Sequence, residues 1–312
     1  MKGLLASMAL CLIIFACGTK SETSTADTKS SGSSAITGEM LNFTAYESNP
    51  VFSGTATDTW DKNIRERGFI LFEDGIFNMW YTGYRDGDSE VMHLGYATSS
   101  DGINWKRYEK NPIVGTDWVE DVNVVKDKDT YYMFAEGKGD IAHLLISKDK
   151  VTWTEQGNLD IRQVNGQPIS LGPYGTPTAW LEDGSWYLLY ERGDLGVWLA
   201  KSSDLKVFTN VQDEPVLVPG PELYDQFGIA VNQVVKNDGK YYAYYHATAF
   251  KDWSEWSSCV AISEDRIHWK KYDQNPIQVE NKSSPILVND GKQNRLYTMH
   301  PAVAVHFPTV RQ

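Results

Sequence analysis

The stretch SSDGINW, residues 99–105, introduces a pattern that recurs along the chain. A serine is followed two residues later by an aspartate, and four residues after that by an aromatic residue. The pattern returns in SKDKVTW (147–153), SSDLKVF (202–208) and SEDRIHW (263–269). The final aromatic residues lie roughly 48, 55 and 61 residues apart. Repeats of this length are typical of propeller blades with variable loops. Because aspartate and serine side chains bond nearby backbone amides, we expect the repeated aspartates to be structural.

A turn followed by an aromatic run precedes each copy of the pattern. The four segments are EDGIFNMWYTG (73–83), KDKDTYYMFAEG (126–137), LEDGSWYLLYERG (181–193) and KNDGKYYAYYHAT (236–248). A fifth such hairpin, NDGKQNRLYTMH (289–300), is followed by one more strand, PAVAVHF, and then the chain ends. The last blade therefore lacks its fourth strand.

The missing strand is expected at the start of the chain. LNFTAYESNPVF (41–52) aligns without a gap on INWKRYEKNPIV (103–114), which is the fourth strand of the first blade with its exit turn. The sequence therefore predicts an all-β fold, a five-bladed β-propeller of four-stranded blades whose ring is closed by the N-terminal strand. Closure removes sheet edges that would invite aggregation. A β-sandwich would not explain a repeat split between the two termini.

The composition limits the partners. The 312 residues carry a formal net charge of −12 and show no evident basic patch, so nucleic acid is not an expected partner. The 11 tryptophans and 17 tyrosines suit a β-rich protein and sugar binding. Outside the first 17 residues, Cys259 is the one cysteine in the sequence, so we expect no internal disulfide and no cysteine-based metal site.

The N-terminus predicts a targeting signal. Lys2 precedes the apolar run GLLASMALCLIIFAC, which is too short for a spanning helix. Its end, residues 14–17, resembles a bacterial lipobox, which implies that Cys17 is lipidated. We expect a signal peptide at 1–16, a flexible Ser/Thr-rich tether at 17–40 and a propeller catalytic domain at 41–312. The implied location is the outer membrane or cell surface, lipid-anchored, with the periplasmic side as an alternative. An ordinary secretory signal is the other interpretation.

Ionisable residues gather at two sets of equivalent positions. In a propeller the first strand of each blade begins, and the second strand ends, on the same face near the axis. The ends of the second strands are Thr82, Glu136, Glu191, His246 and His300, and the starts of the first strands are Glu66, Asp121, Thr176, Val231 and Ser284. Carboxylates and imidazoles that face one pocket indicate acid–base chemistry.

The segment DVNVVKDKDTYYMF (121–134) resembles the second blade of the five-bladed glycoside hydrolases of families 32, 43, 68, 117 and 130. MWYTGY (79–84) and HLGYATSSDGINWKRYEKNPI (93–113) are similar to these enzymes too, and the resemblance covers roughly residues 41–307. Glu120-Asp121 has the spacing of their acidic motif, but Val122 replaces the usual proline. Thr176 stands where families 32 and 43 supply a glutamic acid.

The resemblance implies a glycoside hydrolase that cleaves a poly- or oligosaccharide, with inversion expected. Glu66 would be base or nucleophile, and Asp121 would stabilise positive charge on the sugar. Since family 117 uses a histidine as acid, His246 and His300 are candidate acids beside Glu191 and Glu136. We expect substrate contacts from Arg67, Glu136, Tyr174 and His300. No cofactor is expected to be required, although the resemblance allows a structural Ca²⁺ on the axis, for which the sequence identifies no ligands.

Structural interpretations stand beside these roles. Glu66 with its flanking arginines could form an ion-pair cluster, and Asp121 could bind backbone amides. Glu136 and Glu191 could be rim residues paired with Lys138 and Arg192, and the two histidines could be interior residues. The alternative function is a non-catalytic glycan-binding surface lipoprotein, which the threonine at 176 favours. Alternatively, the protein is a purely structural propeller stabilised by calcium.

Overall fold

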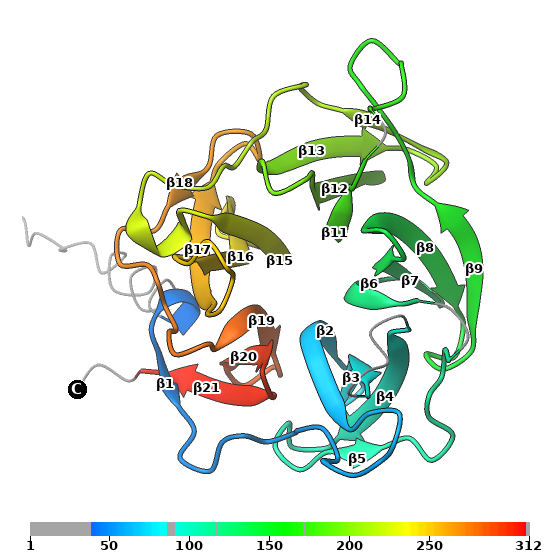
Figure 1. Cartoon of the computed structure of the whole chain (residues 1–312), viewed down its shortest axis with the longest axis vertical. Coiled ribbons are helices and arrows are strands. Elements are labelled where there is room, and N and C mark those ends of the chain that lie inside the picture. The colour runs from blue at the N-terminus through cyan, green and yellow to red at the C-terminus, as the bar shows by residue number, and fades with distance from the viewer. Residues whose placement is uncertain (1–38, 86–90, 116–117, 171, 310–312) are drawn as a thin grey trace, which may run out of the picture.

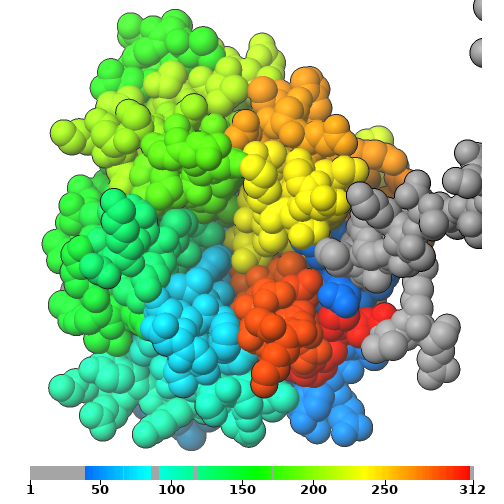
Figure 2. Space-filling model, turned by 180° about the vertical axis from the view of Figure 1, so that it is seen from behind, coloured from blue at the N-terminus to red at the C-terminus, as the bar shows by residue number. Residues whose placement is uncertain are grey.

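The fold was analysed in a computed structural model that describes residues 39–85, 91–115, 118–170 and 172–309, apart from the side chain of Glu66. Five antiparallel sheets surround a central axis (Figure 1). Their innermost strands β2, β6, β11, β15 and β19 contact one another in a closed ring. The predicted all-β, five-bladed propeller is therefore confirmed. On the opposite face, atoms of neighbouring blades meet around the axis (Figure 2).

Each blade follows the predicted order from the axis outward. Blade one contains β2 (Asn63–Glu73), β3 (Ile76–Tyr84), β4 (His93–Ser99) and β5 (Lys106–Arg107). Blade two contains β6 (Glu120–Asp127), β7 (Thr130–Gly137), β8 (Ile141–Ser147) and β9 (Trp153–Asn158). Blade four contains β15 (Gly228–Asn237), β16 (Lys240–Thr248), β17 (Ser257–Ser263) and β18 (Lys270–Lys271), and a short 3-10 helix, η1 (Leu223–Asp225), precedes it.

Blade three differs from the predicted four strands. Beside β11 (Gly175–Glu182), β12 (Ser185–Glu191), β13 (Val197–Ser202) and β14 (Val207–Asn210), it has a fifth strand, β10 (Asp160–Arg162), that pairs parallel with β14. The segment between blades two and three is long enough to turn back and add this strand. It adds apolar contacts too, because Ile161 is buried in the core between these blades.

The aromatic runs fill the space between neighbouring blades. Phe134 of β7 packs on Trp186 and Phe208 of blade three, with ring centroids 5.8 and 6.2 Å apart respectively. Trp80 of β3 meets Trp153 of blade two edge-on at 6.1 Å. Strand residues with large flat side chains suit such surfaces, because they bury much area with few rotamers. The core is thus a series of layers between the sheets.

The repeated serine and aspartate form the expected turn. The Asp101 carboxylate accepts backbone hydrogen bonds from Ile103 at 2.9 Å and Asn104 at 2.8 Å, and Ser99 supports the same turn. The equivalent bonds recur in the other three copies, at Asp149, Asp204 and Asp265. These aspartates are structural, as predicted.

The ring closes through the N-terminus. β1 (Phe43–Ala45) pairs with β21 (Ala304–Pro308), which follows β19 (Ser283–Asn289) and β20 (Asn294–His300). The strand is shorter than predicted, but Phe52 adds a bridge to Val303. Asn49 exchanges two hydrogen bonds with the backbone of Val305, each 2.9 Å long. Asn111 makes the same pair of bonds in blade one, which confirms the alignment of 41–52 on 103–114.

The packed chain begins slightly before the predicted boundary. Met40, expected at the end of the tether, is 2% exposed and its carbonyl accepts a hydrogen bond of 2.7 Å from the Tyr244 hydroxyl. The predicted signal peptide, Cys17 and most of the tether lie outside the described residues, so lipidation stays a prediction. No helix within the described ranges is long and apolar enough to cross a membrane.

Ring closure can be tested with two truncated chains. One begins at Glu39 and keeps every closing contact, and the other begins at Ser53. The shorter chain loses β1 and the ring of Phe52, which lies 4.8 Å from that of Tyr81, and it exposes the edge of β21. We expect it to aggregate or to melt roughly 10 °C below the longer chain, from the large cost of losing a buried phenylalanine. Size-exclusion chromatography and thermal melts provide the measurement. Equal melting temperatures for two monomeric chains would refute the closure.

Candidate active site

The inner strands break their regular pairing where they approach the axis. Register shifts occur between Arg65 and Phe69 in β2, between Glu120 and Asn123 in β6, and at the matching places in β11 and β15. Asp121 lies within its shift and has a left-handed backbone, with φ of 52°. A β-bulge of this kind redirects a side chain. The bulges therefore place one residue from each of blades one to four around the axis.

The strand pairing shows that the residue of blade one equivalent to Asp121 is one position later than predicted. Phe69 pairs with Trp80 as Asn123 pairs with Phe134, so the second residue before each is equivalent. That residue is Asp121 in blade two and Arg67, not Glu66, in blade one. Arg67 shares the left-handed backbone, with φ of 59°. Glu66 is the preceding residue of β2, and its side chain lies outside those described, so its predicted role is untested.

Arg67 joins three blades at the axis. Its side chain is 2% exposed, and Nη1 donates to Oδ2 of Asp121 at 3.1 Å. Nη2 donates to the carbonyl oxygen of Val231, in blade four, at 2.9 Å. Both terminal nitrogens are thus bonded to the protein itself. Arg67 therefore holds the Asp121 carboxylate in place, which is a structural role. The predicted ion pair of the flanking arginines with Glu66 stays untested, because that side chain is not described.

The second arginine of β2 is paired as well. Nε of Arg65 lies 2.8 Å from Oε2 of Glu120, whose side chain is 4% exposed. The other carboxylate oxygen accepts a hydrogen bond of 2.6 Å from the indole of Trp118. Arg65 and Arg67 are therefore each paired with a carboxylate, Glu120 and Asp121 respectively. Neither arginine is thus an uncompensated cation that would attract an anionic glycan.

Glu136 ends β7 and lies buried against blade three. Its Oε2 accepts a hydrogen bond of 2.7 Å from the backbone nitrogen of Thr176. The close approach requires glycine before that threonine, since a Cβ on Gly175 would lie 1.9 Å from the same oxygen. Burial raises the pKa of Glu136 well above its ordinary value, and the charges of Asp121 and Glu120 raise it further. The protonated form of Glu136 is therefore favoured relative to that of an exposed glutamate.

Glu191 ends β12, where it pairs with Gly175. Burial, followed by the charge of Asp194, raises its pKa from 4.5 to about 7. Its Oε1 accepts a hydrogen bond from the backbone nitrogen of Asp194, a residue that the sequence analysis did not identify. The expected partner Arg192 bonds Ser170 instead. The Arg67 charge lowers the pKa of both Glu191 and Glu136, which shows that all three groups share one electrostatic environment.

His300 is the last residue of β20, and His246 lies two residues before the end of β16. His246 is 6% exposed, and its Nδ1 lies 3.2 Å from Oδ1 of Asn232. Its ring meets Trp256 edge-on at 4.7 Å. Both neighbours were missed, because neither belongs to the repeated positions. His300 ends β20 opposite Ser283 and is half-buried.

Tyr174 is less suited to its predicted contact with substrate. Its hydroxyl donates to the carbonyl oxygen of Leu159 at 3.1 Å, and its ring packs on the core between blades two and three. Burial raises the pKa of the Tyr174 hydroxyl, followed by the charge of Asp160. The side chain therefore helps to hold the segment that leads into β11.

Several polar atoms of the ring lack a hydrogen-bond partner within the described part of the chain. They are Nε of Arg67, Oγ1 of Thr176, Nδ2 of Asn232 and Oγ of Ser284. Buried polar atoms normally bond protein, water or ligand. Three of them lie at the bulges of blades one, three and four, and Ser284 lies near the start of β19. These positions are consistent with a polar space that sugar hydroxyls or water can occupy. Across the described residues, no group of three or more His, Cys, Asp or Glu could hold a metal ion. No step below depends on calcium.

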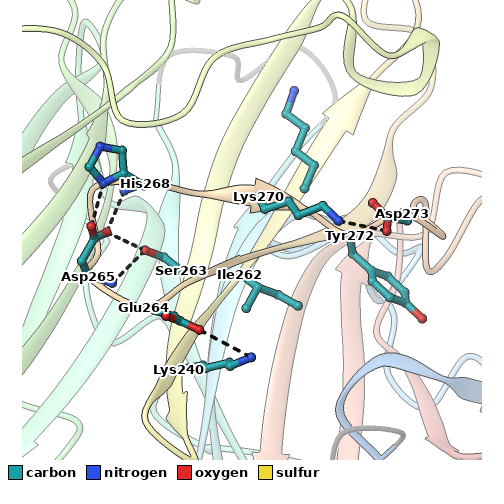
Figure 3. A pocket seen from close by; sticks show the side chains of 10 residues that line it. Lys240, Ile262, Ser263, Glu264, Asp265, His268, Lys270, Tyr272 and Asp273 are labelled. Atoms are coloured by element: carbon teal, nitrogen blue, oxygen red, sulfur yellow. Dashed lines mark hydrogen bonds and ion pairs between the residues drawn. The ribbon is translucent and has the colours of Figure 1, made fainter.

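A hollow of about 470 Å³ lies elsewhere, along the outer strands of blade four (Figure 3). Most of its charged side chains pair with one another, such as His268 with Asp265 at 2.6 Å and Lys270 with Asp273 at 3.0 Å. Asp265 belongs to the structural turn of the repeat. The hollow is therefore a product of the blade architecture and not part of the ring.

Residues 37–169 match the Glycosyl hydrolases family 32 N-terminal domain. A 1,2-beta-oligomannan phosphorylase from Thermoanaerobacter sp. (strain X514) is 26% identical over 227 residues, which cover 67% of this chain and 72% of the relative.

Two solved structures are similar in fold. A glycosyl hydrolase from Bacteroides ovatus superimposes with a TM-score of 0.71 at 17% identity, over 85% of this chain and 92% of its own. A beta-1,2-mannobiose phosphorylase from Listeria innocua does so with a TM-score of 0.66 at 16% identity, over 85% and 96%. The comparisons confirm the predicted resemblance to the five-bladed propeller glycoside hydrolases, and they support a glycosyl-processing enzyme without separating hydrolase from phosphorylase.

Proposed function

We propose that this protein is a glycoside hydrolase that cleaves an oligo- or polysaccharide at the ring of bulged residues. One observation carries the proposal. An aspartate fixed by a buried arginine shares its surroundings with two carboxyl groups of raised pKa, of which that of Glu191 is about 7. Glycosidases typically have carboxyl groups whose environments give them different pKa values, so that one is protonated while another is ionised.

The proposed roles follow from burial and charge. Glu191 is half-buried and only partly protonated at neutral pH, which suits a group that donates its proton to the leaving oxygen. Asp121, which accepts a hydrogen bond from Arg67, stabilises positive charge at the anomeric carbon. The glycosidic bond breaks as a water oxygen bonds to that carbon. In the inverting mechanism, the water proton passes to a base, for which Glu66 stays the predicted residue.

Hydrolysis is favoured over phosphorolysis by the charge of the ring. Phosphate would have to approach Asp121, Glu120 and Glu191, while Arg65 and Arg67 are already paired with carboxylates. Water carries no such penalty. We therefore expect turnover that does not depend on inorganic phosphate and releases no sugar phosphate. Because the two phosphorylases named above are named for β-1,2-linked mannosides, these are the first substrates to assay.

A glycan-binding lipoprotein is the second candidate. It is favoured by Thr176, which stands where the resemblance implies a catalytic glutamate. Cys17 would anchor either protein, and this location remains part of the proposal. Turnover of any glycan by the soluble domain separates the two candidates.

Asp121→Asn tests the role of the fixed carboxylate. The amide keeps the shape and removes the charge, so we expect kcat to fall by at least roughly a hundredfold. Oligosaccharide binding should change little. Asp149→Asn, in a structural turn, is the matched control and should keep full kcat. Wild-type kcat in the Asp121 variant on a substrate that the wild type cleaves would contradict the assignment.

Glu191→Gln tests the environment of Glu191 without any substrate. A carboxyl whose pKa is raised from 4.5 to about 7 on folding destabilises the native state as pH rises through this window. Below about pH 4.5 the effect is absent, and above about pH 7 it is complete. The glutamine variant should thus gain on the order of 2 kcal/mol in unfolding free energy relative to wild type between pH 5 and pH 8.5. Urea titrations measure it, with exposed Glu214→Gln as control. A pH-independent difference would count against the raised pKa.

The same residue should govern the pH–rate profile. Because the acid must be protonated, we expect kcat/KM to fall about tenfold per unit well above pH 7. A glycoside with a good phenol leaving group needs little protonation, so Glu191→Gln should lose far less activity on it than on a natural linkage. Glu136→Gln and His246→Ala should affect both substrates alike. If the leaving group restores activity to one of these variants instead, that residue is the acid.

A further inference from the structure

The loop of residues 249–256 joins β16 to β17 directly beyond the ring. β16 brings His246 to the ring, and the loop starts three residues later. Trp256, at the other end of the loop, meets His246 edge-on with ring centroids 4.7 Å apart. Trp256 covers the start of β15 too, since a Cβ built on Gly228 would lie 3.4 Å from its Cη2. The loop therefore borders the candidate site.

The loop is held in one shape by hydrogen bonds. The Thr248 hydroxyl donates to the carbonyl oxygen of Glu255 at 2.8 Å and accepts from the nitrogen of Phe250 at 3.0 Å. The nitrogen of Trp256 donates to Oδ1 of Asn281, before β19, at 3.0 Å. These bonds tie both ends of the loop to the body of the propeller. Aromatic side chains on such a loop are presented in a defined position.

Two aromatic rings of this loop face solvent. Trp253 is 47% exposed and Phe250 is 44% exposed. Trp253 has a left-handed backbone, with φ of 56°, which costs a tryptophan about 1 kcal/mol or more. Its ring lies 6.3 Å from that of Trp256. A strained backbone that keeps a large apolar ring in water indicates that the exposed ring has a use.

The chemistry of the loop fits an uncharged sugar. Flat indole rings pack on the C–H faces of pyranoses, while nearby polar groups bond the hydroxyls. Asp252 and Glu255 are exposed beside the rings, with Lys251 as the loop's cation, so the loop carries a net charge of −1 and does not favour an anionic glycan. His246, Trp256 and Trp253 form a continuous path from the ring outward.

We propose that Trp253 and Trp256 form a sugar-binding subsite that holds a neutral glycosyl unit of the substrate next to the one being cleaved. The inference rests on the proposed function and specifies it: the substrate is an uncharged oligosaccharide that extends from the axis over blade four. Trp253 is the residue that determines specificity, because its ring is available for stacking.

The test compares Trp253→Ala, Trp253→Phe and a control, Val164→Ala, in the full chain. Val164 is another exposed apolar residue, 55% exposed, in the turn between β10 and β11. The dissociation constants of β-1,2-mannotriose, xylotriose, cellotriose and trigalacturonate are measured by calorimetry, and KM and kcat are measured on the same sugars. Wild type should bind a neutral trisaccharide more tightly than trigalacturonate. For that trisaccharide, Trp253→Ala should raise Kd and KM at least fivefold over wild type, while kcat stays within twofold. For Trp253→Phe and Val164→Ala, Kd and KM should stay within twofold to threefold of wild type.

The outcomes separate this inference from the proposed hydrolase. Unchanged Kd and KM in Trp253→Ala, with an active wild type, overturn the subsite and leave the hydrolase intact. Weaker binding by Trp253→Ala, with a wild type that binds but cleaves nothing, supports the subsite and overturns the hydrolase. Preference for trigalacturonate overturns the neutral-sugar assignment. A wild type that neither binds nor cleaves any of these sugars overturns both the subsite and the hydrolase.

Discussion

The buried guanidinium of Arg67 is the interaction on which the candidate site depends. It bonds Asp121 of blade two and the carbonyl oxygen of Val231 of blade four, so one side chain of blade one spans the axis. Thr178 of blade three donates to the same carbonyl at 2.7 Å. A buried charge is stable only when it is paired and hydrogen-bonded. Removing the Arg67 side chain would break both of these hydrogen bonds, and breaking a buried ion pair typically costs about 3–5 kcal/mol. The blades and the site are therefore stabilised together.

Burial and the charge of Arg67 act together on the pKa values of the acids in the ring. Arg67 is in direct contact with Asp121 and acts on Glu136 and Glu191 only through its field. Arg67 compensates the charge of Asp121, as Arg65 compensates that of Glu120. For Glu136 and Glu191, loss of hydration and neighbouring carboxylates outweigh that field, so their pKa values rise. The propeller produces this division simply by bringing five strand starts together, since acids from different blades cannot all ionise at short range.

The sequence predicted the architecture because the fold repeats. The Ser-x-Asp turns and the Asn49/Asn111 equivalence each recur with the same hydrogen bonds, and a repeated local constraint can be read by alignment. The site was predicted less fully. The extra residue in the bulge of β2 moves Arg67 into the place assigned to Glu66, and bulges leave no mark in a hydrophobic pattern. Asn232 and Trp256 contact His246 from a bulge and a loop respectively. These positions do not recur between blades, so alignment of the repeats cannot identify them.

Blade three explains how the ring could work without a glutamate at position 176. That residue offers its backbone nitrogen to Glu136, and Gly175 beside it has no side chain to block the approach. The strand start thus stabilises an acid from blade two in place of supplying one. On the proposed function, the proton donor moves to the neighbouring strand of the same blade, where Glu191 pairs with Gly175. The dipeptide at 175–176 is then adjacent to both protonatable carboxyls. Neither residue of this dipeptide has an ionisable side chain. This allows Glu136 and Glu191 to approach the start of β11 from the two neighbouring strands.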